Sequence, residues 1–230
     1  MERIDDLQCK GLKFIQDDRY FPFGTDGVEL ANFVCGSGKD RAIDIGCGSG
    51  IVTVLLAGKK GIPTVGVEIQ PPLAALAEKN IRLNNLENIS SVFNMRAQDL
   101  PAKFARGAFN IVAANPPYRK AGSGDSSLAE EVRIARHETE ITLCELLDVS
   151  AYLLGSGGKL YMVHQTERLD EVLYEAAARK LMPKVLQILL PSENKPPHIF
   201  LLKCIKDARR GLDVKLPRAV YGSTACDYPE

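Results

Sequence analysis

Apolar residues along the chain form short runs rich in Val, Ile and Leu, which alternate with longer segments of helical periodicity. This alternation starts near residue 41 and is typical of a parallel sheet whose strands are joined by crossover helices. The runs predict strands over 42–45, 64–67, 90–94, 110–113, 159–163, 184–189 and 199–205. The periodic segments predict helices over 51–59, 72–84, 138–154 and 168–180, and a short one over 27–34.

The pattern predicts one α/β core with two flanking segments. Residues 1–40 are expected to form an extension that packs on the core, 41–208 the core itself, and 209–230 a weakly patterned tail. Pro71-Pro72 is predicted to open one helix, and Gly157-Gly158 to close another just before the strand that starts at Lys159.

Composition limits the class of protein. The chain has 230 residues, 45% of them apolar and 25% charged, which is ordinary for a globular domain. No apolar run is long enough to span a membrane, and the acidic N-terminus is unlike a targeting peptide, so we expect a cytoplasmic protein. The six cysteines form no C-x-x-C pair, so neither a metal site nor a disulfide framework is expected.

A glycine-rich turn follows the first strand of the predicted core. Asp44-Ile45-Gly46-Cys47-Gly48-Ser49-Gly50 leads from that strand into a helix, and its glycines allow a sharp turn and the approach of a ligand to backbone N–H groups. The next strand ends in Glu68, placed to accept hydrogen bonds from both ribose hydroxyls of a nucleoside. Together the two features predict an adenosine-containing ligand.

Two details favour S-adenosyl-L-methionine over a dinucleotide. The turn begins with the acid Asp44, which would hold the ligand's ammonium group and repel a pyrophosphate. Asp99-Leu100, after the third strand, would contact adenine, with the Asp99 carboxylate accepting from its amino group; a helix or turn cap is the alternative.

On these motifs the chain, over about residues 24–205, resembles the Rossmann-like class I methyltransferases. The resemblance implies a seven-stranded, mostly parallel sheet with an antiparallel last strand and helices on both faces. It also implies a cofactor site made of the residues above: Asp44, Gly46, Gly48, Gly50, Glu68, Asp99 and Leu100.

The tetrapeptide Asn115-Pro116-Pro117-Tyr118 follows the fourth strand and is the predicted catalytic motif. The Asn115 amide oxygen and the Pro116 carbonyl would accept both hydrogens of a conjugated NH2 group and aim its nitrogen at the methyl donor, so Asn115 also borders the cofactor. Tyr118 would stack on a flipped base. The motif is similar to the signature of amino-methyltransferases that act on adenine N6, guanine N2 or the glutamine amide of release factors, so it specifies the reacting group and leaves these substrates open.

Longer similarities favour adenine in RNA, most closely the family that methylates adenine 37 of a valine tRNA at N6. In that family a segment like the one from Phe21 to Ala31 closes over the cofactor's methionine end, which implies that Thr25 and Asp26 contact the cofactor; helix capping is the alternative. The segments 135–138 and 192–203 also resemble it. The stretch before Asp44 is too short for the N-terminal domain of release-factor enzymes, and guanine-N2 enzymes often carry Asn-Pro-Pro-Phe.

An RNA substrate, and tRNA in particular, is therefore the expected partner, with DNA as the alternative. Net charge is zero, which argues against a broad basic face, although Lys and Arg outnumber Asp and Glu over 184–218. Local patches of Lys and Arg could still bind RNA; the alternative is that each is simply a solvated group of surface side chains. The expected RNA contacts are Arg119, Lys120, Arg136, His137 and Lys195.

Overall fold

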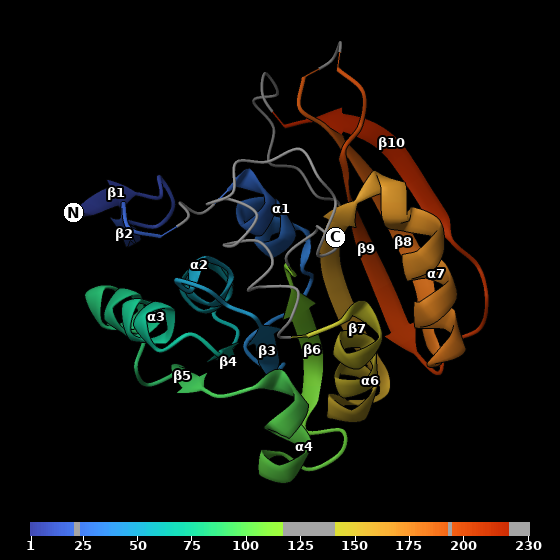
Figure 1. Ribbon diagram of the computed structural model, residues 1–230, viewed down its shortest axis with the longest axis horizontal. Helices are drawn as coiled ribbons and strands as arrows, with labels where there is room; N and C mark the ends of the chain where they lie inside the picture. Colours follow the sequence, from blue (N-terminus) through green and yellow to red (C-terminus); the bar gives the residue numbers. More distant parts are fainter. Residues whose placement is uncertain (21–23, 117–140, 193–194, 221–230) are drawn as a thin grey trace.

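The protein forms a mixed α/β sheet with helices on both faces, preceded by a small N-terminal hairpin (Figure 1). The computed structural model describes residues 1–20, 24–116, 141–192 and 195–220. The strands are β1 (Glu2–Asp6), β2 (Lys13–Asp17), β3 (Ala42–Ile45), β4 (Thr64–Glu68), β5 (Ser90–Asn94), β6 (Phe109–Ala114), β7 (Leu154–Gln165), β8 (Leu181–Leu190), β9 (Ile199–Lys206) and β10 (Asp213–Ala219). The α-helices are α1 (Thr25–Phe33), α2 (Ile51–Val54), α3 (Pro71–Leu83), α4 (Leu100–Lys103), α6 (Leu143–Leu153) and α7 (Leu169–Ala178). The π-helix η1 (Leu55–Lys59) and the 3₁₀ turns η2 (Ala97–Asp99) and η3 (Thr166–Arg168) complete the described elements.

Two hydrophobic clusters, one on each face of the sheet, hold the layers together. Strand side chains alternate between faces, so in β3 Ala42 belongs to one cluster while Ile43 belongs to the other. Residues of α1, α2 and η1 fill the first cluster, and those of α4, α6 and α7 fill the second. Helices on both faces were predicted, and the packing confirms this.

The main sheet has the order β10-β8-β9-β7-β6-β3-β4-β5. All seven predicted strands are present, and β9 runs antiparallel to both β7 and β8, as expected for the last of them. The sheet has an eighth strand, because β10 pairs in parallel with β8 at the edge. The sequence did not reveal β10, because Val214 and Leu216 are exposed and Pro217 interrupts the strand. No helix of the described residues is long and apolar enough to cross a membrane.

Two predicted helix boundaries were wrong. The helix expected over 138–154 ends at Leu153, and Gly157-Gly158 lie inside β7 instead of closing it. Gly157 has a φ of 79°, which makes it an irregular point of the strand, near a register shift between β6 and β7. The same helix begins at Leu143, because Thr142 is its N-cap and forms a capping box with Glu145; residues 138–140 lie outside the described part.

The N-terminal segment contributes the β1–β2 hairpin and α1, and they pack in different places. The hairpin lies against α3 at one end of the molecule, opposite β10 (Figure 1). Helix α1 packs on α2 and β7. The hairpin was not predicted, and the division into extension, core and tail stays a prediction.

Candidate active site

The predicted functional residues come from strands that end at one edge of the sheet. β3, β4, β5 and β6 are parallel neighbours, so their carboxyl ends meet there. The chain leaves β3 for β4 on one side and returns to β6 on the other, so β3 and β6 flank the switch point at which open α/β sheets bind ligands. With strands about 4.8 Å apart, the ends of β6, β3 and β4 span about 10 Å.

The glycine-rich turn joins β3 to α2. Gly46, Gly48 and Gly50 have φ values of 73°, 56° and 92°, in the left-handed region that other residues rarely adopt. A Cβ at Gly46 or Gly48 would meet no atom within 4 Å, so these two are needed for backbone conformation and leave the turn open to a ligand. At Gly50 a Cβ would lie 3.0 Å from that of Ala77, so this glycine also allows α3 to pack closely.

Glu68 ends β4 with its carboxylate directed at the turn. It is buried, and its two oxygens accept the N–H groups of Gly48 and Gln70, each at 2.9 Å. A carboxylate held by two backbone amides has a fixed direction. This is the geometry that a pair of hydroxyl groups requires for recognition.

Asp44 lies beneath the turn and is fully buried. Its Oδ2 accepts the Thr53 N–H at 3.1 Å and the Thr53 hydroxyl at 2.8 Å. Burial raises the pKa of Asp44 to about 7, despite these hydrogen bonds, and the charge of Glu68 adds to the rise. The sequence predicts that Asp44 holds an ammonium group of the cofactor, and this stays a prediction, with Thr53 as the partner that the structure gives it.

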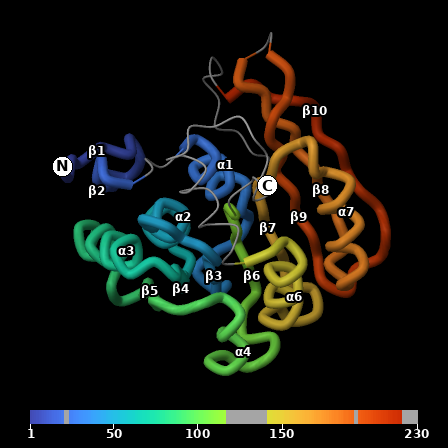
Figure 2. The backbone as a smooth tube through the Cα atoms, in the orientation of Figure 1, coloured from blue at the N-terminus to red at the C-terminus, as the bar shows by residue number. Residues whose placement is uncertain are grey.

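Asn115 and Pro116 follow β6 directly and are both half-buried. Asn115 is on the same face as Ala113, the face that α1 and α2 cover. A Cβ on Gly27 of α1 would lie 3.8 Å from Asn115 Nδ2 and 2.9 Å from Ile51 Cγ2. Gly27 therefore lets α1 lie directly against Asn115 and the start of α2, and Figure 2 shows the tip of β6 beneath α1.

The close packing of α1 also brings Thr25 and Asp26, in its first turn, to the region of Asn115. No side chain caps this helix, because its N-cap residue is Gly24. The Thr25 hydroxyl lies 3.5 Å from Asp26 Oδ1. The N-cap residue thus makes no side-chain capping bond, and the cofactor contacts of Thr25 and Asp26 stay predictions.

Asp99 and Leu100 follow β5 and differ in exposure. Asp99 is exposed at the end of η2, and its side chain makes no capping hydrogen bond to α4. Leu100 is fully buried in the core, and its N–H donates to the Ala97 carbonyl. The structure thus leaves the Asp99 carboxylate accessible and gives Leu100 a packing role; the cofactor contacts of both stay predictions.

Six of the predicted residues lie outside the described part of the chain: Pro117, Tyr118, Arg119, Lys120, Arg136 and His137. Of the expected RNA contacts, Lys195 alone is described. It is exposed between β8 and β9, where its N–H donates to the Ser192 carbonyl at 3.1 Å.

The family model of the methyltransferase small domain matches residues 30–180. This match covers the end of α1, the glycine-rich turn, Glu68 and Asn115. The chain belongs to the methyltransferase small domain family.

Relatives and solved structures agree with this assignment. A tRNA1(Val) (adenine(37)-N6)-methyltransferase of Dickeya chrysanthemi is 31% identical over 192 residues, which cover 82% of this chain and 75% of the relative. Enzymes with the same name from Porphyromonas gingivalis and Yersinia pestis are each 27% identical, covering 90% and 93% of this chain and 81% and 88% of their own lengths.

Among solved structures, a predicted O-methyltransferase of Agrobacterium tumefaciens has a TM-score of 0.67 at 18% identity, covering 87% of this chain and 90% of its own. A geranyl diphosphate C-methyltransferase of Streptomyces coelicolor, solved with S-adenosyl-L-homocysteine, has a TM-score of 0.61 at 14% identity, over 79% and 77% of the two chains. Both likenesses show the Rossmann-like methyltransferase fold.

The site residues of this small-domain methyltransferase fit S-adenosyl-L-methionine, its cofactor. Asp44 is a buried acid, and both its burial and the charge of nearby Glu68 oppose its ionisation. A cationic ligand beside the two acids would favour their ionised forms. Glu68 is fixed at the strand end beside the open glycine turn, where a ribose would be held. When bound, the cofactor supplies a methyl group on a cationic sulfur.

Sequence reasoning missed three residues that shape this methyltransferase site. Thr53 holds Asp44, and Asn94 donates from Nδ2 to the carbonyls of Glu68 and Ile69, each at 2.9 Å. At Gly66 a Cβ would lie 3.0 Å from Cys47 Sγ. Gly66, inside a strand, carried a signal, since an interior glycine often marks a close approach. The other two are ordinary polar residues whose partners only the fold reveals.

Proposed function

We propose that this protein methylates the exocyclic N6 amino group of an adenine in RNA, and that the RNA is a tRNA. The placement of Asn115-Pro116 carries the proposal: these residues follow β6 at the switch point, beside the glycine-rich turn that follows β3. The names of the Dickeya, Porphyromonas and Yersinia relatives support an adenine of tRNA as the methyl acceptor.

The chemistry follows from two oxygen acceptors on a rigid corner. The nitrogen of a conjugated NH2 group is a poor nucleophile, because its lone pair is delocalised into the ring. The Asn115 amide oxygen and the Pro116 carbonyl accept its two hydrogens, which fixes the nitrogen and returns electron density to it. The proline ring fixes φ of Pro116 and holds Asn115 extended, so the two acceptors keep their spacing.

The nitrogen would gain the methyl group as the bond between that methyl and the cationic sulfur breaks, which leaves S-adenosyl-L-homocysteine. The methylated cation would then lose a proton to water. A strong general base is therefore not part of the proposal. The residues that would border the cofactor are Thr25, Asp26, Asp44, Glu68 and Asp99, with the Asp99 carboxylate accepting from the adenine amino group. Pro117 and Tyr118 complete the motif in the sequence, with Tyr118 as the base-stacking residue.

Measuring kcat and cofactor affinity separately in a variant of Asn115 tests these roles. Replacing Asn115 with Ala removes one acceptor, so we expect kcat to fall about 10²–10³-fold, while the Kd for S-adenosyl-L-homocysteine changes less than threefold. An Asn115→Ala protein that loses cofactor affinity, or one that keeps full kcat, contradicts the assignment. The alternatives, guanine N2 and the glutamine amide of a release factor, share this prediction and differ in the product.

A further inference from the structure

Strand β2 of the N-terminal hairpin is held by two asparagines, Asn80 in α3 and Asn84 at its C-cap. The Lys13 N–H donates to Asn84 Oδ1 at 2.9 Å, and Asn84 Nδ2 donates to the Lys13 carbonyl at 2.7 Å. One turn earlier in α3, the Ile15 N–H donates to Asn80 Oδ1 at 2.6 Å, and Asn80 Nδ2 donates to the Ile15 carbonyl at 3.1 Å. Both side chains thus satisfy backbone groups at an open strand edge.

The spacing of the two asparagines matches that of the two strand residues. Four residues of α-helix advance about 6.0 Å, and two residues of strand advance about 6.6 Å. The helix and strand run in opposite directions, so Asn80 meets Ile15 while Asn84 meets Lys13. The two asparagines therefore dock β2 in the same manner and form a matched pair.

Asn80 differs from Asn84 in one further bond. Its Nδ2 also donates to the Ser49 carbonyl at 3.0 Å, and Ser49 lies between Gly48 and Gly50 in the glycine-rich turn. The other Nδ2 hydrogen of Asn84 goes to the Asn80 carbonyl within α3. Asn80 is fully buried, and both hydrogens of its amide group are used.

The bond to Ser49 fixes a peptide plane of the cofactor turn. The Ser49 carbonyl and the Gly50 N–H belong to the same peptide unit, and that N–H donates to the Cys47 carbonyl at 2.8 Å. With both ends of the unit bonded, the left-handed conformations of Gly48 and Gly50 are held. Gly48 in turn donates to Glu68.

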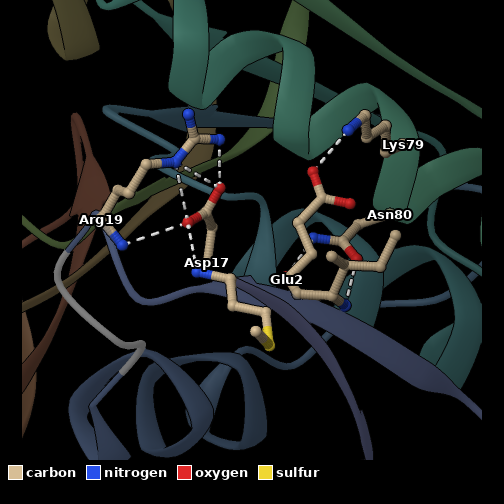
Figure 3. Close-up of polar contacts among 7 residues, drawn as sticks. Glu2, Asp17, Arg19, Lys79 and Asn80 are labelled. Atoms are coloured by element: carbon tan, nitrogen blue, oxygen red, sulfur yellow. Dashed lines mark hydrogen bonds and ion pairs between the residues drawn. The ribbon is translucent and has the colours of Figure 1, made fainter.

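The hairpin segment also packs through Leu12 and Phe14, which are buried in the first hydrophobic cluster, whereas its other polar contact with α3 involves exposed side chains. Lys79 on α3 pairs with Glu2 at 2.5 Å, with both side chains partly exposed. Asp17 is buried and accepts hydrogen bonds from Arg19, which lies two residues away on the same segment (Figure 3). Exposed ion pairs add little to stability, so the two asparagines carry most of the polar docking.

We propose that Asn80 is a positioning residue that couples the docking of the N-terminal hairpin to the conformation of the cofactor turn. One side chain bonds both elements, so a docked hairpin favours the turn that binds S-adenosyl-L-methionine. By linkage, bound cofactor favours the docked hairpin to the same extent. The proposal concerns cofactor affinity and is independent of which methyl acceptor the enzyme uses.

The matched pair provides the test. Asn80→Ala and Asn84→Ala each remove two hydrogen bonds to β2, but only Asn80→Ala removes the bond to the turn. We expect the Kd for S-adenosyl-L-homocysteine, measured by calorimetry, to rise roughly tenfold in Asn80→Ala and less than twofold in Asn84→Ala. KM for the cofactor should rise in parallel in Asn80→Ala, with kcat within twofold of the wild type.

Hydrogen exchange tests the reverse direction, and its measurement on the wild-type protein does not depend on the folding of a variant. Saturating S-adenosyl-L-homocysteine should slow amide exchange in β2 of the wild-type protein, and this protection should persist in Asn84→Ala and disappear in Asn80→Ala. Equal losses of affinity in the two variants, an unchanged Kd in Asn80→Ala, or no cofactor-dependent protection of β2 in the wild type would overturn the proposal.

Discussion

The buried acid beneath the glycine turn should make the stability of the cofactor-free protein depend on pH. Burial and the charge of Glu68 raise the pKa of Asp44 to about 7, whereas an unfolded aspartate has a pKa of about 3.9. Between these pH values the folded state binds more protons than the unfolded state, so the free energy of unfolding falls as pH rises. Multiplying the pKa difference by about 1.4 kcal/mol per pH unit gives a decrease of about 4 kcal/mol in the free energy of unfolding, and this decrease is complete above pH 7.

Replacing Asp44 with Asn removes the titration while keeping the shape and an acceptor for Thr53. Urea unfolding between pH 4 and pH 8 gives the free energy of unfolding of both proteins. The pH dependence of the difference between the two free energies measures the effect of Asp44, because the contributions of the other titrating groups cancel. We expect the wild type to lose about 2–4 kcal/mol relative to Asp44→Asn across this range. Asp170→Asn, at an exposed position of α7, is the control and should follow the wild type. Parallel curves for wild type and Asp44→Asn would refute the reasoning.

Four further outcomes are expected. Glu68→Gln should raise the Kd for S-adenosyl-L-homocysteine at least tenfold, because an amide accepts only one of the two backbone N–H groups and no longer offers a carboxylate to the ribose; an unchanged Kd would remove Glu68 from the site. Gly27→Ala should destabilise the protein by about 1–3 kcal/mol in urea unfolding, because the new Cβ would lie 2.9 Å from Ile51 Cγ2; a neutral effect would mean that α1 packs more loosely. Tyr161→Phe should cost about 1 kcal/mol in the same assay, because the buried hydroxyl donates to the Cys35 carbonyl at 3.2 Å. Binding of tRNA should weaken steeply with salt, with a log–log slope of several if several phosphates are contacted, and a flat dependence would argue against RNA as the partner.

The parts of the fold predicted from the sequence are those with a strong periodic signal. The strands of the core were found because both faces of a parallel sheet are buried, which makes each strand an apolar run. β10 was not predicted because it is an edge strand in which Val214 and Leu216 are exposed. The hairpin was not predicted because β1 is polar and exposed and because β2 is completed by Asn80 and Asn84, which no local pattern in residues 2–17 reveals.

The candidate site divides in the same way. Strand order and the glycine turn sufficed to place Glu68 and Asn115 at one edge of the sheet, because parallel strands bring their carboxyl ends together. Side-chain contacts between residues far apart in the sequence could not be predicted. Thr53 beneath Asp44 and Asn80 against Ser49 depend on how helices lie over the turn, and Asn80 and Ser49 are 31 positions apart.

The central claim is that the corner at Asn115-Pro116 presents an adenine amino group to the methyl donor. Incubation with S-adenosyl-L-methionine labelled in the methyl group and with unmodified tRNA, followed by digestion and nucleoside mass spectrometry, tests it most directly. The account predicts label in N6-methyladenosine and none in a release factor offered under the same conditions. Label in N2-methylguanosine, or in the glutamine of the release factor, would contradict it.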